Sequence, residues 1–574
     1  MKWLKKCKEQ LTGLIDAISR FPLTTLFLLA AVLVNAYSIS TEKDDTKLLL
    51  TFIFGAFLSA VTQAAYERFF STYSSRLALM GAAIILTGGY YLIVRPAPTL
   101  STEIEIRTVV AMFALLWAFI WVPVIKSSTS FNKSFMITFK SFFISLFFSG
   151  IIFIGIDIIL VAFNELIFQI GYTAYPQTAN VIFMLFAPLY FLSLIPNYSR
   201  AKHDTIDQAA HYPKFLDILL SYILIPLLGV FTLILVVYIF KTIGGSFWDD
   251  NLLEPMLVSY AITVILLYIL VSELENKFTS FYRKVFPKVL IPIVLFQIAS
   301  SLISLTDTGI THNRYFVILF GLFAIIVGVL LSILPVRKNG VIAALLIISC
   351  VISIVPPVDA FTVSRNSQIG MLEEELLKYD MLENNKIKPN ESVSEKDQRI
   401  ITNAVHYLDQ MGYLMEIDWL PKNFDVYKDF YATFGFHEYQ ESGDANQAVY
   451  LSIEPSTPIN ITGFDHFIQV DFSNSSEKES SDFEKAGKHY SLLKSSEILK
   501  IIGENSQELI SFNTQEIYDK FYKYNAAKGA ITADEATFTK ENNRAKITIV
   551  VQNVSIEKQS NQNNASVFVF VQIK

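Results

Sequence analysis

Long apolar segments alternate with short polar ones along the first 357 residues of the chain. A helix that crosses a bilayer needs about 20 mostly apolar residues. The segments that fit this pattern are residues 24–40, 47–65, 77–94, 107–125, 141–163, 179–197, 215–240, 255–272, 289–306, 315–335 and 341–357. The pattern therefore predicts a polytopic α-helical membrane bundle of about 11 transmembrane helices.

The pattern changes after Val358, where apolar positions recur with the spacing of soluble helices and strands. Residues 365–384 and 392–410 have helical spacing, which predicts a helical stalk over residues 365–412. Strand-like segments occur at residues 448–454, 466–472, 545–554 and 565–573. We therefore expect three parts, namely a loosely amphipathic cytoplasmic segment (1–23), the bundle (24–357) and a soluble α+β domain (358–574).

Composition and charge divide at the same place. The chain is 52% hydrophobic with a mean hydropathy of +0.42, too apolar for a soluble protein of 574 residues. Of the net charge of −6, residues 1–360 carry +5 and residues 361–574 carry −11, by our count over the sequence. So acidic a C-terminal domain argues against nucleic acid as a partner. The two cysteines of the chain are Cys7 and Cys350, so the C-terminal domain has no cysteine that could form a disulfide.

The charges of the loops predict the orientation in the membrane, because cytoplasmic loops accumulate Lys and Arg. With a cytoplasmic N-terminus, 19 Lys and Arg residues fall in inside segments and six in outside loops. An odd number of spans then places the domain after residue 358 on the extracytoplasmic side. We therefore expect a multi-pass protein of a bacterial cell membrane, with the lipid bilayer as its first partner. An exported domain without cysteines is consistent with a bacterial protein.

Ionisable residues are rare inside the predicted spans. Asp157 is the clearest, about two turns from the outer end of the fifth span. A carboxylate there is either an ion or substrate ligand, or a group paired with Arg95 or Arg107 or reached by water. The proline residues at 188, 226 and 292 interrupt spans, which is typical of broken transport helices and also of ordinary packing.

The soluble domain lacks the patterns that carry common chemistry. Its four histidines, His406, His437, His466 and His489, have no metal-ligand spacing. There is no nucleophile elbow, phosphate loop or dinucleotide fingerprint. The sequence thus offers no catalytic residue, metal ligand or cofactor site, and it favours a non-enzymatic role.

One stretch of the bundle is distinctive. It runs from Glu-Leu-Glu-Asn-Lys-Phe at residue 273 to a Gly-Ile-Thr-x-x-Arg-Tyr element formed by Gly309, Ile310, Thr311, Arg314 and Tyr315. This stretch, with residues 215–228 before it and 367–389 after it, resembles the bacterial membrane family catalogued as domain of unknown function 4153. The resemblance covers roughly residues 130–400 and implies a membrane location without implying a reaction.

Arg314 is a cation beside a predicted span, on the side where cations are few, and Asp307 lies seven residues before it. It is either a clamp for an anionic group, or one of two interfacial anchors with Tyr315, or a salt-bridge partner that holds the 307–314 loop. The candidate functional residues are therefore Gly309, Thr311, Arg314 and Tyr315 with Asp307, together with Asp157.

Three functions fit these observations. The first is a membrane-anchored sensor or interaction protein that presents its domain to an extracytoplasmic ligand or protein partner. The second is a transporter or lipid-handling protein, suggested by the number of spans and their prolines. The third is a lipid-carrier-dependent glycosyltransferase, which needs an acidic residue in the first outer loop, where Glu42, Asp44 and Asp45 lie.

Overall fold

The structure is a computed structural model of the full chain. It describes residues 12–96, 100–242, 253–439, 448–454, 457–473, 479–495, 498–524, 530–557 and 562–574. The chain divides into two compact units, Met1–His437 and Glu438–Lys574. We call them the membrane unit and the C-terminal unit. Part of the predicted amphipathic segment 1–23 lies outside the described residues, and residues 12–20 of it are helical.

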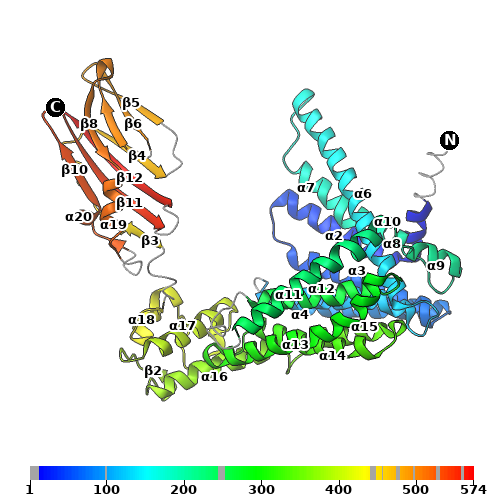
Figure 1. The fold of residues 1–574 in the computed structure, drawn as a ribbon. Coiled ribbons are helices and arrows are strands. Elements are labelled where there is room, and N and C mark those ends of the chain that lie inside the picture. Colours follow the sequence, from blue (N-terminus) through cyan, green and yellow to red (C-terminus); the bar gives the residue numbers. More distant parts are fainter. Residues whose placement is uncertain are drawn as a thin grey trace. The chain divides into compact units, whose positions relative to one another are not determined.

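Up to residue 354 the described part of the membrane unit consists of long apolar helices with shorter helices between them (Figure 1). They are α2 (Pro22–Thr41), α3 (Thr46–Phe69), α4 (Tyr73–Val94), α5 (Thr102–Trp121), α6 (Phe131–Leu166), α7 (Ala174–Ala179), α8 (Ala187–Leu194), α9 (His203–Ala210), α10 (Lys214–Ile218), α11 (Ile225–Thr242), α12 (Leu253–Leu270), α13 (Lys277–Thr308), α14 (His312–Ile333) and α15 (Gly340–Ile354). Helices dominate here because only they satisfy every backbone polar group of a single segment within the bilayer.

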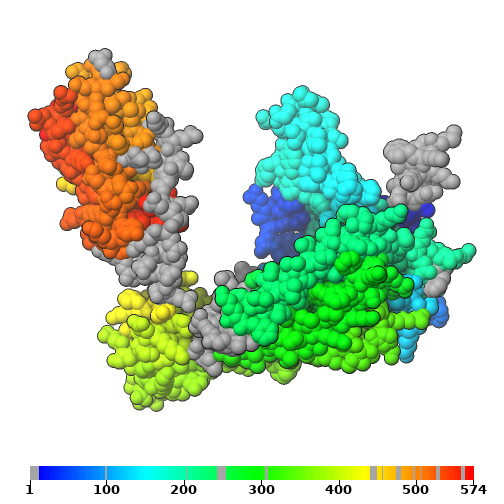
Figure 2. Space-filling model, in the orientation of Figure 1, coloured from blue at the N-terminus to red at the C-terminus, as the bar shows by residue number. Residues whose placement is uncertain are grey.

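Among the described residues, ten helices are long and apolar enough to cross a membrane, with mean hydropathies from 1.5 to 3.0. The shorter apolar helix Glu254–Leu270 corresponds to the eighth predicted span. The predicted polytopic bundle is therefore confirmed. The distal part of α6, together with α7, projects from the other helices (Figures 1 and 2).

Two of the predicted proline interruptions coincide with π-helical segments. These are η2 (Asn180–Phe186), which ends two residues before Pro188, and η3 (Leu219–Leu224), which ends two residues before Pro226. Because proline has no N–H to donate, the regular hydrogen-bond ladder cannot continue unchanged at such positions. Pro292, in contrast, lies inside the continuous helix α13.

Small residues bring α13 and α14 close together in an antiparallel hairpin. A Cβ atom added at Gly321 would lie 2.8 Å from Ile298, and one at Gly328 would lie 3.1 Å from the carbonyl oxygen of Pro287. Close backbone approach of this kind is a common way for helices to associate in a bilayer.

The chain then continues into a helical subdomain, residues 360–434. Its helices are α16 (Ala360–Lys378), α17 (Glu395–Gln410) and α18 (Val426–Phe434), with the short hairpin β1–β2 (Leu382–Glu383, Lys386–Ile387) and the 3-10 turn η6 (Leu414–Glu416). Ser394 caps α17 by accepting from the N–H of Asp397. The two predicted stalk helices correspond to α16 and α17. The helical subdomain belongs to the membrane unit, so the compact units divide near residue 437, whereas the hydropathy pattern changes near 358.

The C-terminal unit contains two sheets. The six-stranded sheet has the order β4-β12-β11-β3-β9, and β10 also pairs with β11. Its strands are β3 (Ala448–Ile453), β4 (His466–Ser473), β9 (Ala530–Ile531), β10 (Thr537–Glu541), β11 (Ala545–Glu557) and β12 (Gln562–Ile573). The second sheet is an antiparallel meander of β5 (Glu479–Lys485), β6 (Lys488–Lys494), β7 (Ile498–Ile502) and β8 (Glu508–Asn513).

The four strands that the sequence predicts are β3, β4, β11 and β12, and the α+β class is confirmed; α19 (Gln515–Phe521) and α20 (Ala533–Ala536) are the helices of this unit. The central hairpin β11–β12 pairs Ile547 with Val571 and buries both. The second sheet is not predicted from the sequence pattern: its first strand, β5, is largely polar and exposed and lacks the alternation of a half-buried strand.

Candidate functional site

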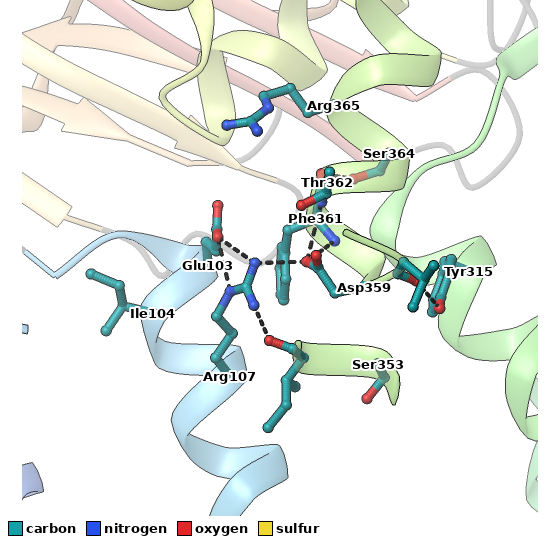
Figure 3. Close-up of polar contacts among 12 residues, drawn as sticks. Glu103, Ile104, Arg107, Tyr315, Ser353, Asp359, Phe361, Thr362, Ser364 and Arg365 are labelled. Carbon is teal, nitrogen blue, oxygen red and sulfur yellow. Dashed lines mark hydrogen bonds and ion pairs between the residues drawn. The ribbon is translucent and has the colours of Figure 1, made fainter. Parts of the chain in front are cut away.

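Polar contacts join the helical subdomain to the ends of α5 and α14, close to the end of α15. Arg107 of α5 is at the centre of this region (Figure 3). Its guanidinium donates from Nε to Glu103 Oε1 at 2.9 Å and from Nη2 to Asp359 Oδ1 at 2.6 Å. Nη1 donates to the carbonyl oxygen of Ile354, the last residue of α15. Arg107 therefore joins α5, α15 and the start of α16.

Asp359 has two roles at this junction. It is the N-cap of α16, where Oδ1 accepts from the N–H groups of Phe361 and Thr362 at 3.0 and 3.1 Å. Its side chain is fully buried. Burial by itself raises the pKa of this carboxyl, but the hydrogen bonds from Thr362, the charge of Arg107 and the hydrogen bond from Phe361 together hold the pKa below its usual range. Asp359 is therefore an ionised, buried partner for Arg107 at neutral pH.

A second connection runs from the same turn of α5 to the turn η6. Tyr413 donates its hydroxyl proton to Glu103 Oε2 at 2.6 Å. Burial, followed by the hydrogen bond to the negative charge of Glu103, raises the pKa of Tyr413. Arg365 of α16 lies over the ring of Tyr413 at 5.4 Å and pairs with Glu416 at 2.8 Å. Glu103 thus contacts Arg107 with one oxygen and the helical subdomain with the other.

The Gly309–Tyr315 element lies against the same helix α16. Gly309 has φ +62° and ψ −175°, a conformation available almost only to glycine. Gln368 Nε2 donates to the carbonyl oxygens of Thr308 and Ile310 at 2.8 and 3.3 Å, and Ser367 Oγ accepts from the N–H of Ile310 at 3.0 Å. The turn between α13 and α14 is therefore hydrogen-bonded to α16 on both sides of its glycine.

Tyr407 of α17 forms the third connection. Its hydroxyl oxygen accepts from the N–H of His312 at 3.0 Å, lies 3.0 Å from His312 Nδ1, and is 2.9 Å from Ser364 Oγ of α16. Burial raises the pKa of Tyr407. The His312 ring stacks on Phe361 with centroids 6.0 Å apart. This contact couples the first turn of α14 to α16 and α17 together.

The structure places the predicted residues of the motif as follows. Thr311 is the N-cap of α14, accepting from the N–H of Arg314 at 3.4 Å. Tyr315 donates to the carbonyl oxygen of Val358, immediately before the buried Asp359. Arg314 has a buried Nη1 without a hydrogen-bond partner among the described residues. The side chain of Asp307 lies outside the described part of the structure.

Asp157 does not take part in this junction. It is half-buried in the projecting part of α6, and its Oδ1 is buried without a hydrogen-bond partner in the described part of the chain. Arg107, one of the two arginines considered as its partner, instead binds Glu103 and Asp359. The structure thus brings Gly309, Thr311 and Tyr315 together and leaves Asp157 apart.

The sequence did not single out the other residues of this region as functional candidates: Glu103, Arg107, Asp359, Gln368, Tyr407 and Tyr413. Two signals were present. Glu103 and Arg107 have the i, i+4 spacing of a helical ion pair, and Asp359 stands one residue before a helix, where Asp is a favoured N-cap. Neither signal identifies the partner across 252 residues of sequence.

The chemistry available at this junction is attachment and positioning. Within the described ranges, no group of three or more His, Cys, Asp or Glu side chains is arranged to hold a metal ion. Charged and polar groups that are buried and mutually bonded rigidify the elements they join, because the cost of leaving any one of them unpaired is high. We therefore describe this site as the coupling junction, composed of Glu103, Arg107, Asp359, the Gly309–Tyr315 element, Gln368, Tyr407 and Tyr413.

The helical subdomain also contains a hydrogen-bonded carboxyl group, Asp397, in the first turn of α17. Asp397 accepts from Tyr379 at 2.5 Å, from Ser394 at 2.7 Å and from Lys378 at 3.0 Å. Burial raises the pKa of Asp397, but these three hydrogen bonds outweigh burial and lower the pKa to about 2. A carboxyl whose folded pKa is depressed stabilises the fold at pH above its unfolded value of about 3.9 and loses that contribution as the pH falls.

Replacing Asp397 with asparagine should therefore destabilise the helical subdomain at pH 6 and have a diminishing effect as the pH falls from about 4 towards 2. The fluorescence of Trp419, which packs on this subdomain's core, measures its unfolding in a chain whose other tryptophans are replaced by phenylalanine. Equal destabilisation by Asp397→Asn at pH 6 and at pH 2 would contradict this assignment.

Comparison with known proteins gives one match. A family described as Domain of unknown function (DUF4153) matches residues 25–385. Searches of curated proteins and of solved structures give no match. The matched residues include Arg107, Asp359, Gln368 and the Gly309–Tyr315 element, whereas Tyr407 and Tyr413 lie beyond them.

Proposed function

Because the chain belongs to the family described as Domain of unknown function (DUF4153), whose description names no activity, we propose a role from the geometry of the coupling junction. The protein is a membrane-anchored sensor or interaction protein. It presents the residues after 358 on the extracytoplasmic side of a bacterial membrane, with the N-terminus in the cytoplasm, and the junction transmits an event there to the bundle.

The observation that carries this proposal is the convergence of three membrane helices on one helical subdomain. α5 reaches it through Glu103, which accepts from Tyr413, and through Arg107, which pairs with the α16 cap Asp359. α14 reaches it through the bond from His312 to Tyr407, and α15, which leads into it, is joined to Arg107 through its C-terminal carbonyl group. A passive anchor needs only the covalent connection at residues 355–359. Buried polar contacts from helices distant in sequence give the subdomain a defined position, so a change in that position alters several spans at once.

A lipid-handling role is the second candidate, supported by one observation. A cavity of about 260 Å³ lies among α2, α3, α5 and the η2–α8 segment, and its lining is almost entirely apolar. Residues that line it include Ala31, Ala56, Phe119 and Phe183. An apolar cavity inside a bundle accepts hydrocarbon, so this candidate predicts retention of a lipid chain there.

The glycosyltransferase reading receives less support. Asp44 accepts from both the N–H and the hydroxyl of Thr46, in the short turn that precedes α3, and it is exposed. This local role accounts for the side chain without a substrate groove.

The sensor proposal can be tested with a variant that weakens the junction but leaves the Arg107–Asp359 ion pair intact. Tyr407→Phe keeps the ring and removes the hydroxyl that bonds His312 and Ser364, a loss of about 1–2 kcal/mol. In the native host, we expect this variant to accumulate in the membrane at the normal level and to reproduce the transcript changes of a deletion strain. Tyr431→Phe, at a half-exposed tyrosine of α18, is the matched control.

Spin labels provide the structural readout of the same experiment. With Cys7 and Cys350 replaced, labels at the exposed positions Glu105 and Asn403 report the distance between α5 and α17. We expect Tyr407→Phe to add a second distance population. A strain carrying Tyr407→Phe that shows this second population and yet keeps the wild-type transcript profile would refute the sensor role.

A further inference from the structure

The stretch from Glu273 to Lys288, which carries part of the family resemblance, takes no part in the coupling junction. A cavity of about 990 Å³ lies at the start of α13. It is lined by Tyr222 of η3 and by residues between Glu275 and Lys284. We call it the α13 groove.

The two walls of the α13 groove are fixed to each other by buried hydrogen bonds. Asn276 caps α13 in a reciprocal capping box with Thr279, and its Nδ2 donates to Ser221 Oγ at 2.8 Å. Ser221 is fully buried and donates in turn to Asp217 at 2.9 Å. The groove is therefore a formed feature of the fold, and its η3 wall is a π-helical segment, a conformation found frequently at functional sites.

More cations than acids line the groove, and two of these cations are exposed. Lys277 and Lys284 are exposed and have no ion-pair partner in the described part of the chain. Arg283 donates from Nη1 to the carbonyl oxygens of Val271, Ser272 and Leu274, which caps the end of α12. Three cations therefore line the groove, against the single acid Glu275.

Aromatic side chains lie beside these cations and remain exposed. Tyr222 is 52%, Phe278 44% and Phe281 57% exposed, and the rings of Tyr222 and Phe278 are 5.3 Å apart. Lys277, Phe281, Lys284 and Lys288 recur at the spacing that places residues on one face of a helix. The groove thus joins a cationic face to an apolar one.

The length of α13 indicates where the groove lies relative to the hydrocarbon core of the membrane. The helix has 32 residues and is about 48 Å long, whereas the hydrocarbon core is about 30 Å thick. Its continuous apolar run begins near residue 289, so the turns before Lys288 extend past the hydrocarbon. Exposed aromatic rings and lysines are typical of this interfacial layer.

We propose that the α13 groove binds the headgroup of an anionic phospholipid. Lys277 and Lys284 contact the phosphate and the negative headgroup, while Tyr222, Phe278 and Phe281 contact the first carbons of the acyl chains. The charge of the groove fits an anion, and its exposed rings fit a ligand that is also apolar, which distinguishes a phospholipid from free phosphate.

The test uses the full chain in mild detergent and native mass spectrometry with phosphatidylglycerol and phosphatidylcholine of identical acyl chains. We expect the wild type to retain phosphatidylglycerol preferentially. Lys277→Gln/Lys284→Gln should reduce that preference roughly 30-fold, since each cation near a lipid surface contributes about 1 kcal/mol. Arg337→Gln/Lys338→Gln removes the same charge from the exposed η5 turn (Val336–Lys338) and should leave the preference unchanged.

A second measurement does not depend on these variants. A photoreactive phosphatidylglycerol should cross-link to peptides that contain residues 217–222 and 276–284 of the wild type. The proposal is overturned if cross-links map elsewhere, if both double variants lose the preference equally, or if millimolar inorganic phosphate displaces the lipid.

Discussion

Replacing Arg107 with methionine should release the helical subdomain from the bundle. The variant removes the only charged partner that the described residues provide for the buried carboxylate of Asp359. Breaking a buried pair on one side costs about 3–5 kcal/mol, because it leaves an uncompensated charge. In lipid nanodiscs, amide hydrogen exchange of the peptide 360–378 should accelerate by at least about 100-fold.

Two further variants make this result specific. Arg107→Met/Asp359→Asn removes the charge as well as its partner and should recover part of the protection, because a neutral amide can keep the N-cap of α16. Lys133→Met breaks the Lys133–Asp207 pair, whose side chains are 30% and 47% exposed, and should change protection by less than about fivefold. Equal effects of Arg107→Met and Lys133→Met would show that Asp359 is not a buried charge.

Replacing Gly309 with alanine should also destabilise the junction, by about 3 kcal/mol. A Cβ atom at this position would lie 2.7 Å from Gln368 Nε2 and 3.2 Å from the sulfur of Met371. The backbone would remain at φ +62°, which strains any other residue. Gln368 would have to move, and its hydrogen bonds to Thr308 and Ile310 would be lost.

Gly370→Ala is the matched control, since no atom lies within 4 Å of the added Cβ and the residue is inside helix α16. That variant should be neutral or stabilising by up to about 1 kcal/mol. Hydrogen exchange of the peptides 305–316 and 360–378 measures both variants. Similar protection of these peptides in Gly309→Ala and Gly370→Ala would contradict the close approach of α16 to the turn.

The predicted spans agree with the helices because a span is recognised from the hydropathy of about 20 consecutive residues. No information about distant parts of the chain is needed for this. The same reasoning located the helices α16 and α17, whose apolar spacing is also a local property. It did not predict the meander β5–β8, whose first strand is polar and is placed by its pairing with β6.

The candidate site was predicted in part. The Gly309–Tyr315 element was identified, and its glycine has the conformation that only glycine adopts readily. Arg314 and Tyr315 were treated together, but their surroundings differ: Tyr315 bonds Val358 beside the junction, while Nη1 of Arg314 is buried without a hydrogen-bond partner among the described residues. Side chains one residue apart on a helix point about 100° apart, so the motif itself could not assign both to one contact.

The sequence by itself determined which segments form long apolar helices and where the series of these helices ends, because these properties depend on local composition. Only the tertiary structure decided that Arg107 pairs with Asp359 and that Tyr407 meets His312, contacts that span 252 and 95 residues of sequence. Such contacts depend on how helices pack, and their burial makes each partner costly to lose. The junction that connects the spans to the helical subdomain is therefore a property of the fold.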